Sequence, residues 1–320
     1  MRPMHIDQNS IKRRHVLSLA CASAASIACP ALAQNFPNKT ITLVVPFPPG
    51  GTIDAAARAL ANQLSSLLGQ SVVVDNRAGV RGSNGTSFVT RAPADGHSLL
   101  FSNLTPLAIT PHMTADGNVI NALAPIGTLA YGPQMLVSSK LNSVSDLRSM
   151  KPSLGHAGNG SLSHVLASLL SRSLGMRLDY KPYRGLAPLL NDMMGEQVGA
   201  AIVPVGAIVG LREPNSIKPL AITAPHKAMP GLPTFEQAGI GEATFNDWLG
   251  VLAPAGTPAS IVSRLNLAVN RIVQMNEVQD RLTSLGLMPQ LSSPEQFGTL
   301  IKLYSNRMAT VIRQEGIQIS

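Results

Sequence analysis

Hydrophobic and polar positions alternate along the chain in blocks that switch between strand and helix character. Residues 40–46 form a β-branched apolar run that ends at a proline, which predicts a buried strand. After a glycine-rich turn, apolar residues recur at helical spacing as far as Leu68, and Gly69 predicts the end of this helix. Further strands are predicted at residues 72–75, 98–102, 135–139, 176–180, 198–203 and 217–223. Further helices are predicted at residues 144–150, 165–174, 187–194, 259–273, 277–286 and 294–315. This alternation predicts α/β units with parallel strands and right-handed crossovers.

Two stretches share one design, a glycine-rich turn that runs directly into an amphipathic helix. They are residues 44–54 (VVPFPPGGTID) and residues 156–164 (HAGNGSLSH). The N-terminus of a helix presents unpaired backbone N–H groups and the positive end of a dipole, so it can bind an anion. Two such turns, more than a hundred residues apart, predict that one small acid is held between two lobes.

In the first turn, Gly50 and Gly51 permit a positive φ and close approach of a ligand, while the two preceding prolines stiffen the entry. Thr52 can cap the helix or donate its hydroxyl to a ligand, and both interpretations stay open. Asp54 favours the helix dipole and can also orient the N–H groups of the turn.

In the second turn, Ser161 is a candidate helix cap and Asn159 is suited to a left-handed conformation. His164 can donate to a carboxylate or be an ordinary surface histidine. Tyr183 and Arg184 follow a predicted strand, where ligands of open α/β sheets bind. Arg184 can bind a second carboxylate or remain solvated.

The N-terminal segment is predicted to be a signal peptide of residues 1–33. A basic stretch, a modest apolar stretch and the small residues before position 34 form its three parts. Arg13 and Arg14 are compatible with either the twin-arginine or the Sec export route. Both cysteines lie in this segment, so the mature chain is predicted to lack disulfides and thiolate chemistry.

Charge and motif content narrow the function classes. The net charge is +8, of which +3 falls in the signal and a scattered +5 in the mature chain, so nucleic-acid binding is not indicated. Metal-hydrolase and phosphate-loop motifs are absent from the sequence. A serine esterase using Ser161 remains the alternative, although Ser161 and His164 lie close together on one helical turn.

Several spaced motifs resemble the Bug-type solute-binding receptors of tripartite tricarboxylate transporters. The resemblance runs from about Phe36 to Gln314. It is carried by residues 44–51, 69–77, 94–96, 158–164, 182–185, 232–234 and 248–258. Residues 200–205 lack the acidic residue that many members have there, which favours a plain acid over an amino acid as ligand.

The resemblance implies an α/β fold of two domains, a Venus flytrap whose domains each contain a mixed, mostly parallel sheet flanked by helices. It implies a periplasmic, cofactor-free, non-enzymatic receptor that binds a small carboxylate in the cleft. Expected partners are membrane permease subunits or a sensor kinase, and a monomer is expected. Residues 34–138 with 254–320 are assigned to one domain and residues 139–253 to the other. The candidate ligand-binding residues are Phe47, Pro49, Gly50, Gly51, Thr52, Asp54, Asn159, Ser161, His164, Tyr183 and Arg184.

Overall fold

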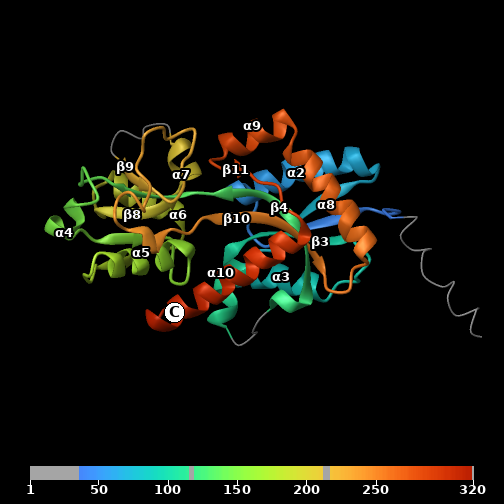
Figure 1. The fold of residues 1–320 in the computed structure, drawn as a ribbon, viewed down its shortest axis with the longest axis horizontal. Helices are drawn as coiled ribbons and strands as arrows, with labels where there is room; N and C mark the ends of the chain where they lie inside the picture. Colours follow the sequence, from blue (N-terminus) through green and yellow to red (C-terminus); the bar gives the residue numbers. More distant parts are fainter. Residues whose placement is uncertain (1–35, 115–118, 212–216, 319–320) are drawn as a thin grey trace, which may run out of the picture.

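The protein consists of two α/β lobes, each built on its own sheet (Figure 1). The computed structural model describes residues 36–114, 119–211 and 217–318, so the predicted signal peptide lies outside the described residues. No helix in these ranges has both the length and the apolar character needed to cross a membrane.

The first lobe is built on a six-stranded sheet. Its strands, in spatial order, are β11 (Met288–Pro289), β4 (Leu123–Gly132), β10 (Asp247–Pro254), β3 (Ser98–Asn103), β1 (Ile41–Val45) and β2 (Val72–Asn76). Its helices are α2 (Thr52–Leu68), α3 (Ser83–Thr90), α8 (Ala259–Val273), α9 (Asn276–Ser284) and α10 (Pro294–Gln314). The β-branched run of β1 is completely buried at Ile41, Leu43 and Val45, as its composition predicts.

The second lobe is built on a five-stranded sheet. Its strands, in spatial order, are β7 (Tyr180–Pro182), β6 (Leu154–His156), β8 (Ala200–Pro204), β5 (Gln134–Ser138) and β9 (Lys218–Ile222). Its helices are α4 (Asp146–Met150), α5 (Leu162–Ser173), α6 (Leu186–Met194) and α7 (Val205–Val209).

Both sheets are mixed, as expected, but parallel pairs do not predominate. The pairs β1–β2, β1–β3, β6–β7 and β6–β8 are parallel, and the remaining five pairs are antiparallel. The reason is that the strands that lead between the lobes, β4, β5 and β10, insert antiparallel to their neighbours.

The chain changes lobe earlier than the predicted crossings near residues 138–142 and 249–254. Strand β4 ends in the first sheet at Gly132, and β5 begins in the second sheet at Gln134, so the first change occurs at Pro133. Strand β10 returns to the first sheet at Asp247. Both crossings therefore fall at the ends of strands, and in the middle of Figure 1 the chain passes between the lobes along β4 and β10.

The seven predicted helices lie close to their predicted bounds, whereas α3 and α7 were not predicted and one predicted strand is misplaced. Helix α2 ends at Leu68 with Gly69 left-handed (φ 68°), as the glycine predicts. The strand predicted at residues 176–180 begins only at Tyr180, because the Ser171 side chain bonds to Met176 and Leu178 and holds this segment against α5. Trp248 is buried with its ring edge against Phe297, which makes it a core residue.

Candidate functional site

The first glycine-rich loop leaves the carboxyl end of β1 and enters α2 without a side-chain cap. Gly51 precedes the helix in extended backbone (φ −83°), and Thr52 is its first residue, so Thr52 is not the cap. Within the described chain, no group accepts a hydrogen bond from the backbone N–H of Gly51, Thr52 or Ile53. An uncapped helix start with free donors can bind an anion.

The Asp54 side chain holds this loop in place through hydrogen bonds. Its Oδ2 accepts from the Gly50 backbone N–H (3.0 Å) and from Arg58 Nε (3.0 Å). Its Oδ1 accepts from Asn76 Nδ2 (3.0 Å), which also donates to the Phe47 carbonyl (3.1 Å). Burial alone would raise the pKa of Asp54, but the hydrogen bonds from Arg58, Gly50 and Asn76 together lower it below its ordinary value. Asp54 is therefore an ionised residue that holds the loop in place.

A cavity of about 630 Å³ opens between the two lobes at this loop. The first lobe contributes the loop and α2, the start of β10 and the turn after α9. The second lobe contributes the beginnings of β5, α6 and α7. Of the predicted binding residues, the cavity is lined by Phe47, Pro49, Gly51, Thr52 and Asp54.

Asp247, which the sequence analysis did not single out, lines the same cavity. Its Oδ2 accepts from Asn103 Nδ2 (2.8 Å), and its Oδ1 accepts from the backbone N–H of Leu104 (3.1 Å) and of Trp248 (2.9 Å). Burial raises the pKa of this carboxyl to about 6, because its neutral donors only partly offset the loss of solvent.

The lobes touch beside the cavity through two glycines. A Cβ at Gly206, in α7, would overlap the carbonyl oxygen of Leu285, and a Cβ at Gly286 would overlap the backbone of Gly206. Two main chains therefore meet directly at this edge of the cavity.

The second glycine-rich loop is satisfied by its own side chains. Ser161 caps α5 by accepting from the His164 backbone N–H (3.2 Å) and lies 2.9 Å from the Ser163 hydroxyl. The ring Nδ1 of His164 accepts from the Gly160 N–H (3.1 Å), which leaves the hydrogen on Nε2. The ring stacks on His156 with centroids 4.2 Å apart.

His164 is held neutral. Burial, then the neighbouring His156 and Arg81, lower the pKa of His164 to about 4. The ring does not accept from the Ser161 hydroxyl within this loop, since its Nδ1 is occupied by Gly160. The pair therefore lacks the hydrogen bond that a serine nucleophile needs from its base.

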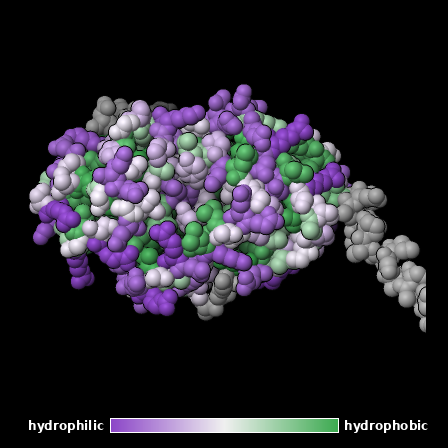
Figure 2. Space-filling model, in the orientation of Figure 1, coloured by the Kyte–Doolittle hydropathy of each residue, from purple (hydrophilic) through white to green (hydrophobic). Residues whose placement is uncertain are grey.

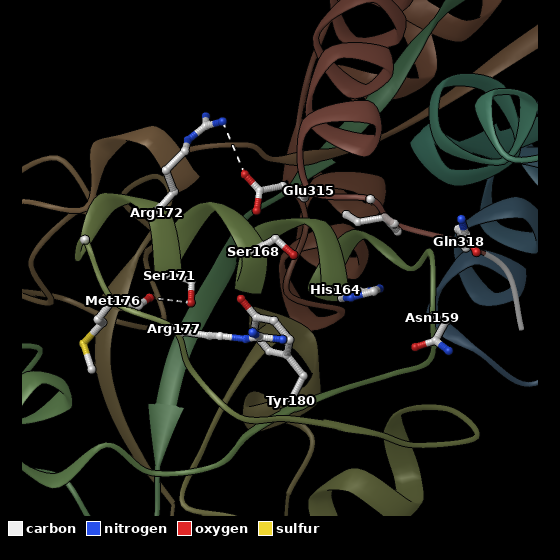
Figure 3. Close-up of a pocket in the computed structure, with 13 residues that line it drawn as sticks. Asn159, His164, Ser168, Ser171, Arg172, Met176, Arg177, Tyr180, Glu315 and Gln318 are labelled. Carbon is white, nitrogen blue, oxygen red and sulfur yellow. Dashed lines mark hydrogen bonds and ion pairs between the residues drawn. The ribbon is translucent and has the colours of Figure 1, made fainter.

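The two loops line different cavities. Asn159 and His164 face a cavity of about 780 Å³ between α5 and the segment after α10, shown in Figure 3 with Tyr180 beneath and Glu315 above. Arg172 pairs with Glu315 across its rim. The second loop lies instead against Met113 and Arg81 of the first lobe, where a Cβ on Gly160 would contact Met113.

The remaining predicted residues lie outside both cavities. Gly50 and Ser161 line neither of them. Tyr183 donates its hydroxyl to Asp192 Oδ2 (2.8 Å) on α6, and Arg184 is exposed with no ion pair to any described residue. Both precede Leu186 and Ala187, which do line the cavity between the lobes.

Sequence reasoning missed three groups of residues at the site. Asn76 could have been found, since it directly follows a predicted strand that neighbours the first loop. Gln134 begins β5 and Asp247 begins β10, the two strands next to the predicted lobe crossings. No sequence motif marks either residue. The Gly206–Gly286 contact joins two segments that are distant in sequence, so no local pattern could reveal it.

Comparison with known proteins agrees with this architecture. The tripartite tricarboxylate transporter family receptor model matches residues 56–317. The chain is 32% identical over 311 residues to protein BugT of Bordetella pertussis, with 93% of this chain and 95% of BugT covered.

Two solved structures show the same fold at similar identity. Rpa4515 of R. palustris, solved with adipate, matches with a TM-score of 0.79 and 31% identity over 89% of this chain and all of that one. MatC of Rhodopseudomonas palustris, solved with malate, matches with a TM-score of 0.74 and 28% identity over 87% of this chain and all of that one.

These matches confirm the predicted resemblance and the two-lobed fold, and they give the esterase alternative no support. The family is one of transporter receptors, and the periplasmic binding protein BugD also has this fold, with a TM-score of 0.74 and 27% identity over 89% of this chain and all of that one. The chain belongs to the tripartite tricarboxylate transporter receptor family and is a periplasmic-type solute-binding protein.

Proposed function

We propose that this protein captures a small organic acid in the cavity between its lobes, with the carboxylate bound at the start of α2. The observation that carries the proposal is the uncapped α2 N-terminus, whose N–H groups at Gly51, Thr52 and Ile53 have no acceptor in the described chain and border the cavity. A carboxylate there would accept hydrogen bonds from these N–H groups and would be stabilised by the positive end of the helix dipole. The adipate and malate bound to Rpa4515 and MatC support a small carboxylate as ligand.

The second glycine-rich loop, which was predicted to hold the same acid, would contact it only in a closed state of the lobes. Asn159, Ser161 and His164 reach the same ligand only if the lobes rotate, since they line a separate cavity or none. Tyr183 and Arg184 stand next to the cavity wall at Leu186 and would move with it. Ligand would raise the population of the closed arrangement through contacts made only there.

Replacing Gly51 by leucine tests the binding site. Gly51 has an ordinary extended φ of −83°, and a Cβ there meets no atom within 4 Å, so the fold tolerates a side chain. That side chain would fill the position of the carboxylate. We expect isothermal titration against mono-, di- and tricarboxylates to show binding by the wild type and a loss of about hundredfold in Gly51→Leu.

The control is Gly195→Leu, at a glycine of similar φ (−85°) after α6 and outside the cavity. It should bind like the wild type. Unchanged affinity in Gly51→Leu would remove the first loop from the site, and no binding to any acid by the wild type would refute the proposed function.

The proposal extends to partners and export. Family membership implies a transporter as partner, and we propose that the protein reaches permease subunits as a monomer. Capture of a sensor kinase only in the presence of ligand would assign it to sensing instead.

Replacing Arg13 and Arg14 by lysine should abolish export if the twin-arginine route is used, and leave it intact if the Sec route is used.

A further inference from the structure

The cavity between the lobes offers one place for a carboxylate and otherwise apolar walls. Its walls are formed largely by Phe47, Ile53, Leu186, Leu249, Leu285 and Leu287. The described residues that line it include no lysine, arginine or histidine. A second carboxylate in this cavity would therefore be desolvated without a cationic partner, which is costly.

The second loop does not supply the missing partner. The Gly160 N–H donates to His164, the Ser161 N–H donates to the Gly158 carbonyl (3.1 Å), and Ser161 caps the helix. The neutral His164 adds no positive charge. Arg184, the candidate partner for a second carboxylate, is exposed and absent from the lining.

Asp247 and Gln134 provide the polar groups of the cavity away from the first loop. Asp247 begins β10, and only β3 lies between β10 and β1 in the sheet. Two strand spacings, together about 10 Å, therefore separate Asp247 from the end of β1. The carboxylate of Asp247 accepts hydrogen bonds but donates none when ionised. It repels a second carboxylate and attracts a hydrogen-bond donor.

Building on the proposed carboxylate site at the first loop, we infer that the ligand is a monocarboxylate with an apolar body and a hydrogen-bond donor at its far end. The first loop binds the acid group, the aliphatic and aromatic walls cover the body, and Asp247 accepts from the donor. This excludes di- and tricarboxylates as the preferred ligands, in contrast to the acids held by Rpa4515 and MatC.

Six-carbon acids that differ only at the far end test this inference. Isothermal titration at about pH 7.5 compares hexanoate, 6-hydroxyhexanoate, 6-aminohexanoate and adipate. We expect hexanoate to bind about tenfold more tightly than adipate, and one of the two donor-bearing acids to bind most tightly. The hydroxy and amino acids distinguish a neutral donor from an ammonium group.

Asp247→Asn identifies the group responsible. Asparagine keeps an oxygen for the Leu104 and Trp248 donors but removes the charge, so the penalty on adipate should shrink and the gain from an ammonium should fall. Asp280→Asn removes a carboxylate from the exposed surface of α9 and should leave all four affinities unchanged. Thermal melting of both variants verifies that they are folded.

The outcomes separate this inference from the proposed function. If adipate binds as tightly as hexanoate or more tightly, and Gly51→Leu abolishes that binding, the inference is refuted and the carboxylate site stands. If hexanoate and its derivatives bind more tightly but Asp247→Asn changes nothing, the role of Asp247 is refuted. If no acid binds, the proposed function fails and the inference fails with it.

Discussion

Asp54 and Asp247 border the same cavity, yet their surroundings shift their pKa values in opposite directions. Burial acts on both, but Asp54 also has a cation, Arg58, and the amide of Asn76, so its pKa falls. Asp247 has only neutral donors, so burial dominates and its pKa rises to about 6. The first carboxylate is suited to a permanent structural role, and the second to contact with a ligand.

The raised pKa of Asp247 predicts a pH-dependent cost to stability. The pKa of this carboxyl is higher in the folded than in the unfolded state. Below its ordinary pKa of 3.8 it therefore does not lower the free energy of unfolding, and the loss grows as the pH rises to about 6. We expect Asp247→Asn to melt at a higher temperature than the wild type at about pH 7.5, with the difference vanishing as the pH falls toward 4. Differential scanning fluorimetry of the ligand-free proteins measures this.

Asp280→Asn again serves as the control, since its carboxylate is exposed. A melting temperature of Asp247→Asn that is equal to or below that of the wild type at about pH 7.5 would contradict the prediction.

At the scale of elements, α2 and α5 look alike in sequence but differ in structure. Both follow a glycine-rich turn, and both were predicted to bind an anion. The residue before α5 is Ser161, whose hydroxyl caps the helix, whereas the residue before α2 is Gly51, which has no side chain to do so. The backbone N–H groups at the start of α2 therefore remain available to a ligand, whereas at the start of α5 the His164 N–H already donates to Ser161.

Ser161→Ala separates a cap from a ligand contact. Loss of the cap should lower the free energy of unfolding by about 1 kcal/mol, with little change in carboxylate affinity, because Ser161 lines neither cavity. Urea unfolding and isothermal titration measure the two quantities. Ser161→Gly, which also lacks the hydroxyl but suits a cap position, should cost only a few tenths of a kcal/mol.

If Ser161→Ala instead keeps its stability but loses binding, the second glycine-rich loop binds the ligand as predicted, and the first loop holds only part of the ligand.

At the scale of the whole molecule, hydrophilic and hydrophobic residues are interspersed on the outer face that Figure 2 shows. Between the lobes, two backbones touch at the Gly206–Gly286 contact with no side chain between them. Neither backbone can give way by changing a rotamer, so a side chain at this point must separate the lobes. The contact therefore limits how closely the lobes approach.

Gly206→Ala tests this contact. The added methyl would overlap the Leu285 carbonyl, so we expect the cavity to open, the radius of gyration in small-angle scattering to increase and ligand affinity to fall about tenfold. Gly195→Ala, whose Cβ would have ordinary contacts of 3.5 Å or more, should leave both unchanged. A Gly206→Ala protein with the dimensions and affinity of the wild type would show that the contact does not control closure.

The sequence by itself determined most helices, the strand–turn–helix design of the first loop and the family, because periodicity, caps and motif order are local properties. It misplaced the crossings and overestimated the parallel pairing, since β4 and β10 are recognised only by their partners in the sheets. Only the tertiary structure decided that the two loops line different cavities, that Asp247 lines the same cavity as Gly51 and that Gly206 meets Gly286. The physical reason is that donors, burial and charge at such a site come from segments brought together by packing, and no local pattern encodes which segments those are.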